Sequence, residues 1–530
     1  MAGTIYSLIP ALLTVLLVIL TKKVILSLGA GVISAALIVA DFSPIGTVTT
    51  LFNTFYNIVF DAGGLFGFLN RWNMSIIIFL IGLGIVTSFV ILSGGAHAFT
   101  QAIIKRVKNR EGVQYTSFAL GLILFIDDYF NALIVGNVSK PLASELKISR
   151  ARVAYIVDST SAPVCIAAPV SSWATAIMGT MAVVFTTIGI EYNTFYAFIR
   201  MIPYHFYVFT AIAMVLITIR FDFNIGIMKK YEKEAREGRD SSITSSASSE
   251  LEGKAQASSG TVWDLVTPIL VLTIATIGTM LFSGYQGAMS DGASPYNLFY
   301  SMLDHIDLAL SLIVGGITGA VTAMIMTYRH VKAKEIKTQE FTKAIYTGAA
   351  SMFTAIIILS LAWAISDLIG ELELGDFLAG IITNSNINAR MLPFMMFIVA
   401  SLIAFATGTS WGSFGILLPI AGTVAVALDI NLLLPTMSAV LSGAVLGDHA
   451  SPISDTTLLS ATGAGCDITA HFNSQLPYAL ISGFIAGIGY FSYGLTKSLF
   501  ISYIIVGLCL TGIAVYARKQ QKLTQASEAV

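Results

Sequence analysis

The residues with the clearest capacity for chemistry are acidic, and they stand inside apolar stretches of the chain. Asp127 and Asp128 are adjacent in FIDDYFNALIVG (125–136). An ionisable side chain at membrane depth is costly, so it is treated as a functional residue by default. Neighbouring carboxylates repel each other and burial disfavours their charged forms, so such a pair can exchange H⁺ and Na⁺. The alternative is that one of the two caps a helix or pairs with a distant cation.

Two further runs place acids beside hydroxyl groups. VDSTSAP (157–163) contains Asp158, and LGDHASPISDTTLLSAT (446–462) contains Asp448, His449 and Asp455. Asp158 and Asp448 are candidates for ion coordination or proton coupling, and helix N-capping is the alternative for both. Asp455 is equally compatible with a cap or a ligand. His449 can titrate near pH 6.5, unless it is a neutral histidine bonded to backbone.

The candidate oxygen ligands for an ion or a substrate are short polar side chains in and near these runs. They are Asn131, Ser159, Thr160, Ser161, Thr407, Thr409, Ser410, Ser451, Ser454 and Thr456. The alternative for each hydroxyl is a hydrogen bond within its own helix. Trp173 and Trp411 are candidates to line a substrate cavity, with core packing as their alternative. Four residues are expected to interrupt helices, because proline removes a backbone donor and glycine loosens a helix: Pro163, Pro169, Gly447 and Pro452.

The elements that hold these residues are predicted to be membrane helices. Of 530 residues, 55% are hydrophobic and 11% are charged, against about 25% charged in soluble domains. Apolar runs such as 5–20 and 74–92 approach the roughly 20 residues that cross a bilayer core. Because Lys22–Lys23 follow the first run and no cleavage site is evident, we interpret it as a retained membrane helix. The net charge of −1 gives no reason to expect a nucleic-acid partner.

Basic residues indicate the topology, because cytoplasmic loops collect Lys and Arg. Six blocks hold 25 of the 29 basic residues, and only Arg71, Arg200, Arg390 and Lys497 lie outside them. If the blocks at 105–110 and 140–152 are both cytoplasmic, the apolar run between them (115–138) must be a re-entrant hairpin. The segment 393–425 is a second hairpin, entering from outside. The N-terminus is then outside and the C-terminus is cytoplasmic.

Eleven spans accompany the two hairpins. The predicted spans are 5–21, 24–41, 74–93, 153–190, 194–219, 262–284, 306–327, 344–368, 432–463, 470–495 and 499–516. The stretch 49–70 is either interfacial or an extra hairpin. The polar linker 220–260 contains SSITSSASSE, a low-complexity run that we expect to be disordered. Three cysteines lie far apart, so neither a metal motif nor a disulfide is expected.

The order of elements repeats with inverted topology. A hairpin, a broken span and a Pro-Tyr span occur twice, with Pro203–Tyr204 in the first half and Pro477–Tyr478 in the second, 274 residues later. Inverted repeats with interrupted helices near the bilayer midplane are typical of secondary transporters. The fold class is therefore predicted to be an all-α polytopic membrane protein in two inverted repeats with broken helices at the midplane.

At FIDDYFNALIVG (125–136), DSTSAPVCIAAPVSSW (158–173) and LGDHASPISDTTLLSATGAG (446–465) the chain resembles the NhaC-type sodium/proton antiporter family of elevator-type secondary carriers. With the repeated topology, the resemblance covers nearly the whole chain. It implies that scaffold and transport subdomains alternate along the sequence. The implied division is scaffold 1–104 and transport 113–219, linker 220–260, scaffold 261–368 and transport 391–495, and an extra helix with a cytoplasmic tail at 496–530.

The expected function is a sodium-coupled secondary transporter, with Na⁺/H⁺ antiport as the first reading. The alternative is a Na⁺-coupled symporter or exchanger of an amino acid or an organic carboxylate such as malate or lactate. No HExxH, GxSxG, GxGD or P-loop pattern lies in a span, so an enzyme is not expected. A channel would not need two inverted broken helices. We expect Na⁺ and H⁺ as transported ions, no cofactor and no transition metal, and a homodimer in the plasma (inner) membrane.

Overall fold

The protein is built of helices throughout the part that the structure describes. This computed structural model describes residues 2–21, 23–60, 69–104, 109–190, 192–243, 257, 259–292, 298–374, 377, 388–452 and 454–528. Within those ranges the only extended pairings are two isolated bridges, Phe60 with Leu69 and Ile243 with Cys466. The all-α prediction is thereby confirmed.

The helices of the first half of the chain are η1 (Ile5–Leu8), α1 (Ile9–Thr21), α2 (Val24–Val39), α3 (Pro44–Val59), α4 (Arg71–Leu92), α5 (Gly95–Ile104), α6 (Arg110–Ile123), α7 (Asp128–Glu145), α8 (Arg150–Ala167), α9 (Ser172–Thr187), α10 (Thr194–Met201), η2 (Ile202–Tyr204), α11 (Phe206–Phe221) and α12 (Met228–Arg236). Those of the second half are α13 (Val262–Ser290), α14 (Leu298–Asp304), α15 (Leu308–Lys332), α16 (Thr338–Ser351), α17 (Phe353–Glu371), η3 (Ala389–Met391), α19 (Leu392–Thr407), α20 (Ser410–Leu428), η4 (Ile430–Leu432), α21 (Leu433–His449), α22 (Asp455–Ala464), α23 (Ile468–Thr496) and α24 (Leu499–Glu528).

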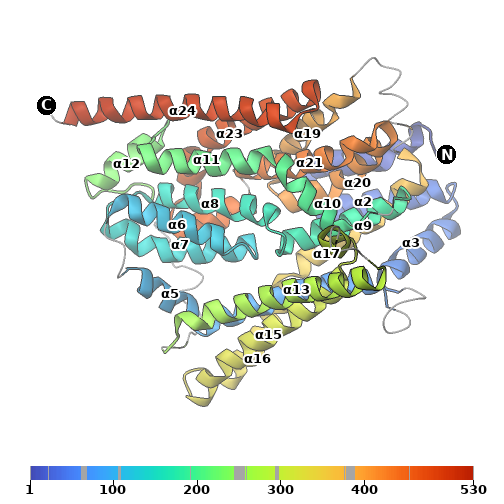
Figure 1. The fold of residues 1–530 in the computed structure, drawn as a ribbon, viewed down its shortest axis with the longest axis horizontal. Helices are drawn as coiled ribbons and strands as arrows, with labels where there is room; N and C mark the ends of the chain where they lie inside the picture. Colours follow the sequence, from blue (N-terminus) through green and yellow to red (C-terminus); the bar gives the residue numbers. More distant parts are fainter. Residues whose placement is uncertain are drawn as a thin grey trace.

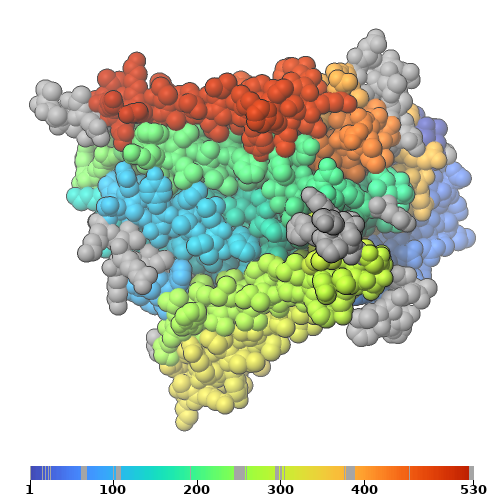
Figure 2. Space-filling model, in the orientation of Figure 1, coloured from blue at the N-terminus to red at the C-terminus, as the bar shows by residue number. Residues whose placement is uncertain are grey.

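The long helices match a polytopic membrane protein. Among the described residues, nine helices are long and apolar enough to cross a bilayer, and eleven are if each bent pair counts as one span. Most of the long helices run side by side along the long axis of the molecule, and the two ends of the chain lie at opposite ends of that axis (Figure 1). In the space-filling view, α13 and α15 form one edge, α23 and α24 form the other, and α6–α12 lie between them (Figure 2).

Glycines allow one group of helices to pack with their backbones in contact. A Cβ on Gly82 of α4 would lie 2.7 Å from the carbonyl oxygen of Gly316 in α15, and one on Gly84 would lie 2.1 Å from the carbonyl oxygen of Gly348 in α16. Small residues at crossings are a general means of association for membrane helices. α13 joins this group by packing against α15, whereas α6–α8, α11 and α19–α24 pack mainly among themselves.

The predicted hairpins and broken spans are present as helix pairs. α6 and α7 form the first hairpin, with its turn at residues 124–127, and α19 and α20 form the second, with its turn at Gly408. Gly408 has φ +69°, which favours glycine. α8 and α9 are bent by 40° at residues 168–171. α21 and α22 are separated by residues 450–454. The sequence order of hairpin, broken helix and Pro-Tyr helix is therefore confirmed in both halves.

Two predicted spans are short. The run 5–21 forms η1 and α1, of 4 and 13 residues, and the run 24–41 forms α2, of 16 residues. Both fall below the roughly 20 residues of a straight span, and their crossing of the bilayer stays a prediction. The ambiguous stretch 49–70 contributes to α3, which begins at Pro44 and ends at Val59; residues 61–68 lie outside the described part.

Two of the four predicted helix breakers do not break a helix. Pro163 lies inside α8, which continues to Ala167. Gly447 lies inside α21, where its missing side chain lets the backbone of α19 approach: a Cβ there would lie 2.2 Å from the carbonyl oxygen of Ser401. Pro169 and Pro452 do stand in the two interruptions, as predicted.

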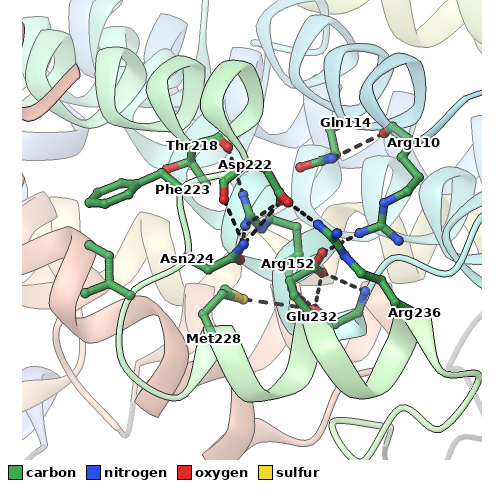
Figure 3. Close-up of polar contacts among 12 residues, drawn as sticks. Arg110, Gln114, Arg152, Thr218, Asp222, Phe223, Asn224, Met228, Glu232 and Arg236 are labelled. Atoms are coloured by element: carbon green, nitrogen blue, oxygen red, sulfur yellow. Dashed lines mark hydrogen bonds and ion pairs between the residues drawn. The ribbon is translucent and has the colours of Figure 1, made fainter. Parts of the chain in front are cut away.

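The first end of the linker 220–260 forms the helix α12 and is docked against other helices. α12 packs beneath the N-terminus of α8, and its Glu232 side chain is 2% exposed. Glu232 accepts hydrogen bonds from the Ser149 backbone N–H (2.9 Å), the Ser149 hydroxyl (2.7 Å) and the Arg110 guanidinium (2.6 Å), as Figure 3 shows. Residues 241–243 of the low-complexity run are also docked, and residues 244–250 lie outside the described part.

A second part of this network ties α8 to the end of α11. Arg152 is fully buried, donates to the Thr218 carbonyl oxygen (3.2 Å) and lies 3.8 Å from Asp222, which Arg236 of α12 also contacts (Figure 3). Burial opposes ionisation of Asp222, but the charges of Arg152 and Arg236 outweigh it and lower the pKa of Asp222. The linker thus fastens α6, α8 and α11 together at one end of the molecule.

Candidate functional site

The candidate site forms where the turns of the two hairpins meet the interruptions of the two broken helices. Each of the four helices that begin there has a polar N-cap whose side chain accepts from the backbone: Asp127 for α7, Ser171 for α9, Thr409 for α20 and Ser454 for α22. Such caps satisfy backbone donors that a helix cannot satisfy itself. The four short polar residues explain why the helices begin where they do.

Equivalent hydrogen bonds join hairpin to broken helix in each repeat. The Ser172 N–H, the first of α9, donates to the Ile126 carbonyl oxygen at 2.8 Å. The Asp455 N–H, the first of α22, donates to the Gly408 carbonyl oxygen at 3.2 Å. Ile126 and Gly408 each precede the N-cap of their hairpin helix. The shared pattern indicates that the two repeats build the same structural unit, although their side chains differ.

The acid pair divides into a cap and an unsatisfied carboxylate. Asp127 accepts hydrogen bonds from the Phe130 N–H (3.0 Å) and from the Ser172 hydroxyl (3.0 Å). It is therefore a helix cap, which was the alternative stated for one residue of the pair. Asp128 is 1% exposed, and its Oδ2 atom has no hydrogen-bond partner among the described residues. A buried carboxylate oxygen without a donor is costly unless it binds a proton or a cation.

Asp448 lies where α21 ends, opposite the second hairpin. It is 2% exposed and accepts from the hydroxyls of Ser410 (2.6 Å) and Ser454. Ser454 also lies 3.0 Å from the Thr456 hydroxyl, oxygen to oxygen. Since Asp448 is close to the C-terminal end of its helix, N-capping, the alternative for this residue, is wrong.

Asp158 forms a second buried centre beside the first. It stands in the interior of α8, so it is not a cap either, and it is fully buried. Its carboxylate accepts from the side chains of Gln475 (2.5 Å), Ser460 (3.2 Å) and Thr457 (3.4 Å). These donors come from α22 and α23, so the carboxylate of the first repeat is held by helices of the second.

Two imidazoles flank this carboxylate. The Nε2 atom of His471 lies 3.3 Å from Asp158, and that of His449 lies 4.0 Å away. Both histidines are buried, and Nδ1 of His449 is 3.1 Å from the Tyr207 hydroxyl. His449 follows Asp448 directly in the sequence. The polar groups around Asp158 and those around Asp448 are therefore joined at this dipeptide.

Asp455 and Tyr129 connect the two repeats at the rim of the site. The Tyr129 hydroxyl donates to Asp455 at 3.4 Å, joining α7 to α22. Trp173 and Trp411 are in edge contact, with ring centroids 5.5 Å apart, and both contact Phe414. The two tryptophans come from α9 and α20, so they belong to different repeats, and the buried contact favours packing as their role.

Three other predicted ligands donate to backbone carbonyl oxygens, Asn131 to neighbouring segments and Thr160 and Ser161 to their own helix. The Asn131 amide nitrogen donates to the carbonyl oxygens of Gly121 (2.7 Å), Leu124 (3.0 Å) and Thr160 (3.3 Å), which closes the first hairpin. Thr160 donates to Ile156 (2.8 Å) and Ser161 to Asp158 backbone (2.9 Å).

The remaining predicted ligands make weaker or less direct contacts. Thr407 makes only long contacts, to the Ala404 carbonyl (3.4 Å) and the Ser413 hydroxyl (3.5 Å). Ser159 and Ser451 are buried.

The sequence reasoning missed the polar residues that complete the site. His471 and Gln475 were overlooked because their segment was noted only for Pro477–Tyr478. Ser172 and Ser460 were also missed. The available signal was an imidazole and an amide four residues apart, a spacing that places both on one face of a helix.

The assembled groups are suited to hard cations and protons. Carboxylates, hydroxyls and helix interruptions provide oxygen ligands, whereas no group of three or more His, Cys, Asp or Glu residues with metal-binding geometry occurs in the described ranges. Sodium sites in secondary transporters are built from such unwound segments.

Comparisons with known proteins agree with this geometry. A protein family described as the Na⁺/H⁺ antiporter family matches residues 164–495. An uncharacterized protein of Haemophilus influenzae is 36% identical over 501 residues, which is 94% of this chain and 92% of the relative. The malate-2H⁺/Na⁺-lactate antiporter of Bacillus subtilis is 36% identical over 104 residues, covering 18% of this chain and 21% of that protein.

A solved structure supports the fold. The YdaH transporter of Alcanivorax borkumensis aligns over 86% of this chain and 89% of its own, with a TM-score of 0.54 and 13% sequence identity. At that identity the likeness concerns the fold alone. The family match covers more than half of the chain, and with it the hairpin of α19 and α20, both helix interruptions and the Pro-Tyr helices. The chain belongs to the Na⁺/H⁺ antiporter family.

Proposed function

We propose that the protein is a sodium-coupled secondary transporter that exchanges Na⁺ for H⁺. The observation that carries the proposal is the buried Oδ2 atom of Asp128, which has no hydrogen-bond partner among the described residues. Asp128 follows Asp127, the N-cap of α7, and lies where four helix N-termini meet. One carboxylate that is alternately protonated and bound to Na⁺ is sufficient to couple the two ions. Asp127 holds the hairpin turn so that Asp128 keeps its position.

Asp448 supplies a second charge to the same site. Its two hydroxyl partners, Ser410 and Ser454, can each turn an oxygen lone pair toward a bound Na⁺. Asp158, with His449 and His471, forms a neighbouring centre that can hold a proton. Asp455, Thr407, Thr409, Ser451 and Thr456 complete the proposed surroundings of the ion.

The transport movement is proposed to be of the elevator type. Most helices that carry the site (α6–α8, α11 and α19–α23) pack mainly with one another, and α4, α13, α15 and α16 form a separate group, which α9 also contacts. In this proposal the first group carries the ion past the second, within the plasma (inner) membrane of a homodimer with its C-terminus in the cytoplasm. The alternative is exchange or symport of an organic solute, which the similarity to the malate-2H⁺/Na⁺-lactate antiporter of Bacillus subtilis supports.

The proposed function is tested by flux into proteoliposomes. A Na⁺ gradient without organic solute should change the internal pH in wild type, and Asp128→Asn should abolish the change while folding normally, since an amide does not exchange a proton. Asp291→Asn is the matched control, because Asp291 is exposed at the end of α13 and pairs with His305. Full activity of both Asp127→Asn and Asp128→Asn would refute the pair as the coupling site.

Ion binding is tested separately by thermal stability. A ligand that binds only the folded state stabilises it by RT ln(1 + [Na⁺]/Kd), about 2.7 kcal/mol at a hundred times Kd. Na⁺ should therefore raise the melting temperature of the purified protein, whereas choline at equal ionic strength should not. The shift should shrink at low pH and vanish in Asp448→Asn. An equal shift in Asp448→Asn would show that Na⁺ is held at the first hairpin alone.

A further inference from the structure

Two buried polar atoms beside the first hairpin have no hydrogen-bond partner among the described residues. One is the acceptor Oδ2 of Asp128, and the other is the donor Nε1 of Trp173. Asp128 is 1% exposed and Trp173 is fully buried. Buried donors and acceptors are normally bonded, so a donor and an acceptor that are both left over in one place are candidates to bond with each other.

The fold brings these two residues together through the contact between the first hairpin and α9. The Ser172 N–H donates to the Ile126 carbonyl oxygen (2.8 Å), and the Ser172 hydroxyl donates to Asp127 (3.0 Å). Asp128 and Trp173 are the next residues on the two sides of this contact. Their side chains are close enough to interact, although they do not reach the geometry of a hydrogen bond.

The other donors nearest to this pair in the sequence are already engaged. The Tyr129 hydroxyl donates to a carboxylate of α22 (3.4 Å). The Asn131 amide nitrogen donates to three carbonyl oxygens, and the Ser172 hydroxyl donates to the N-cap of α7. Among these side chains, the indole N–H of Trp173 is therefore the donor that remains for the Asp128 carboxylate.

Aromatic packing holds the indole ring beside the carboxylate. Its centroid lies 5.5 Å from that of Trp411 and 5.4 Å from that of Phe414, and both of these rings come from α20. Such contacts explain the burial of the Trp173 ring, but they give its N–H no acceptor. Packing and hydrogen bonding are thus separate roles of this side chain.

We propose that Trp173 sets the Na⁺ affinity of the ion site: its N–H donates to the Asp128 carboxylate when no Na⁺ is bound there, and Na⁺ displaces it. An indole nitrogen is a donor only and offers no lone pair to a cation. The hydrogen of the N–H and a Na⁺ ion both carry positive charge, so they repel each other at one buried carboxylate oxygen. This inference rests on the proposed Na⁺/H⁺ exchange at Asp128.

The consequence is a weaker but more readily released ion. A hydrogen bond to an ionised acceptor is among the stronger kinds, and without a donor the buried charge is costly. The Trp173 N–H therefore stabilises the Na⁺-free carboxylate relative to the Na⁺-bound one. Removal of the N–H should tighten the binding of Na⁺ and slow its release, whereas a residue that only packs has no reason to tighten binding when it is replaced.

The proposal is tested by equilibrium binding of radioactive Na⁺ to the purified full-length protein at alkaline pH, where protons compete least. Trp173→Phe keeps an aromatic ring and removes the N–H, so it should bind Na⁺ about threefold more tightly or better. Replacement of Trp173 by benzothienylalanine, which has sulfur in place of the N–H, should do the same with the bicyclic shape preserved. Trp363→Phe is the matched control and should bind as wild type does, because Trp363 is also a buried tryptophan whose Nε1 has no partner among the described residues.

A second measurement follows the indole in the wild-type protein. The chain has five tryptophans, and in a ¹⁵N-labelled sample the indole N–H signal of Trp173 is identified as the one missing from Trp173→Phe. Addition of Na⁺ should shift this proton signal upfield, because the proton loses its hydrogen bond to a charged acceptor. Choline at equal ionic strength should leave it in place.

Either of two results would overturn the proposal. They are a Na⁺ affinity that is unchanged or weaker in both Trp173 replacements, and a Trp173 indole signal that does not respond to Na⁺. If wild type binds Na⁺ and one of these results is found, this inference alone fails. If wild type binds no Na⁺, the proposed exchange fails and this inference fails with it.

Discussion

The contact between α7 and α22 offers a sharp test, because it is made by two glycines. A Cβ on Gly136 would lie 2.5 Å from the backbone carbon of Gly463 and 2.8 Å from the nitrogen of Ala464, and one on Gly463 would lie 2.7 Å from the Ala132 carbonyl oxygen. The opposing atoms are backbone, so no side-chain rotation relieves the clash. Gly136→Ala must therefore move one helix relative to the other.

The required movement follows from these distances. Ordinary contact begins at 3.4 Å, so the gap of 2.5 Å must widen by about 0.9 Å. The Tyr129 hydroxyl is already 3.4 Å from Asp455 across the same pair of helices, so such a shift breaks that bond. α22 also carries Thr457 and Ser460, which donate to Asp158. A displacement of this size therefore disturbs both parts of the candidate site.

Stability and activity should respond differently. Overpacking costs about 1–3 kcal/mol, while alanine is favoured over glycine inside a helix by about 1 kcal/mol. The net destabilisation of Gly136→Ala should therefore be modest, about 0–2 kcal/mol, and the protein should still be produced. Transport should nevertheless fall by at least tenfold, because a misplacement near 1 Å in a preorganised site has large consequences.

The assay is ion flux in proteoliposomes together with the melting temperature of the purified protein. Gly278→Ala is the matched control: Gly278 also lies inside a long helix, and a Cβ there meets nothing within 4 Å among the described residues. The control should transport as wild type does and melt at the same temperature or slightly higher. Wild-type transport by Gly136→Ala, with the stability of the control, would refute the argument from close packing.

Three other predictions concern the topology and the network around Glu232 and Asp222. Single cysteines replacing Arg239 and Lys334 in a background without Cys509 should react only with cytoplasmic reagent, and one replacing Ser290 only with external reagent; external labelling at 334 would contradict the inverted topology. Glu232→Gln, which keeps the shape but weakens charge-assisted bonds to Ser149 and Arg110, should lower the stability by about 1–2 kcal/mol, measured by melting, whereas the exposed Glu237→Gln should not. Arg152 and Arg236 lower the pKa of Asp222 despite its burial, so the stability that its charge contributes is present above the unfolded carboxylate pKa of about 3.9 and is lost as the pH falls through the lower folded pKa. Asp222→Asn should therefore melt below wild type at pH 7, and the difference in melting temperature should narrow below pH 4. A difference that does not depend on pH would exclude the charge of Asp222 as its origin.

Hydropathy and the positions of acidic and helix-breaking residues were sufficient to predict the order of the main helices along the chain. Apolar length gave the long helices, and the acids and prolines in 125–136, 157–169 and 446–462 marked the hairpin turn and both interruptions. Gly447 was misread because a glycine that loosens a helix and one that admits a neighbouring backbone look the same in a sequence.

The candidate site was predicted in outline and not in its connections. The buried acids Asp127, Asp128, Asp158 and Asp448 were all chosen from local context. Their partners could not be, because Asp158 is bonded by Gln475, 317 residues away in the chain. Similarly, α12 looks like an ordinary charged linker helix until its packing shows that Glu232 is buried beneath α8.

If the two groups of helices move past each other as proposed, the linker also sets a limit on that movement. Its first end is fixed at Ile243, which pairs with Cys466 before α23, and its second end at Ala257, whose N–H donates to the Leu92 carbonyl oxygen at the end of α4 (3.0 Å). The fourteen residue steps between these anchors extend at most about 50 Å, at roughly 3.3–3.6 Å per residue. As long as both anchors hold, Ile243 and Ala257 cannot move further apart than this length, and each residue deleted between them lowers the limit by about 3.5 Å.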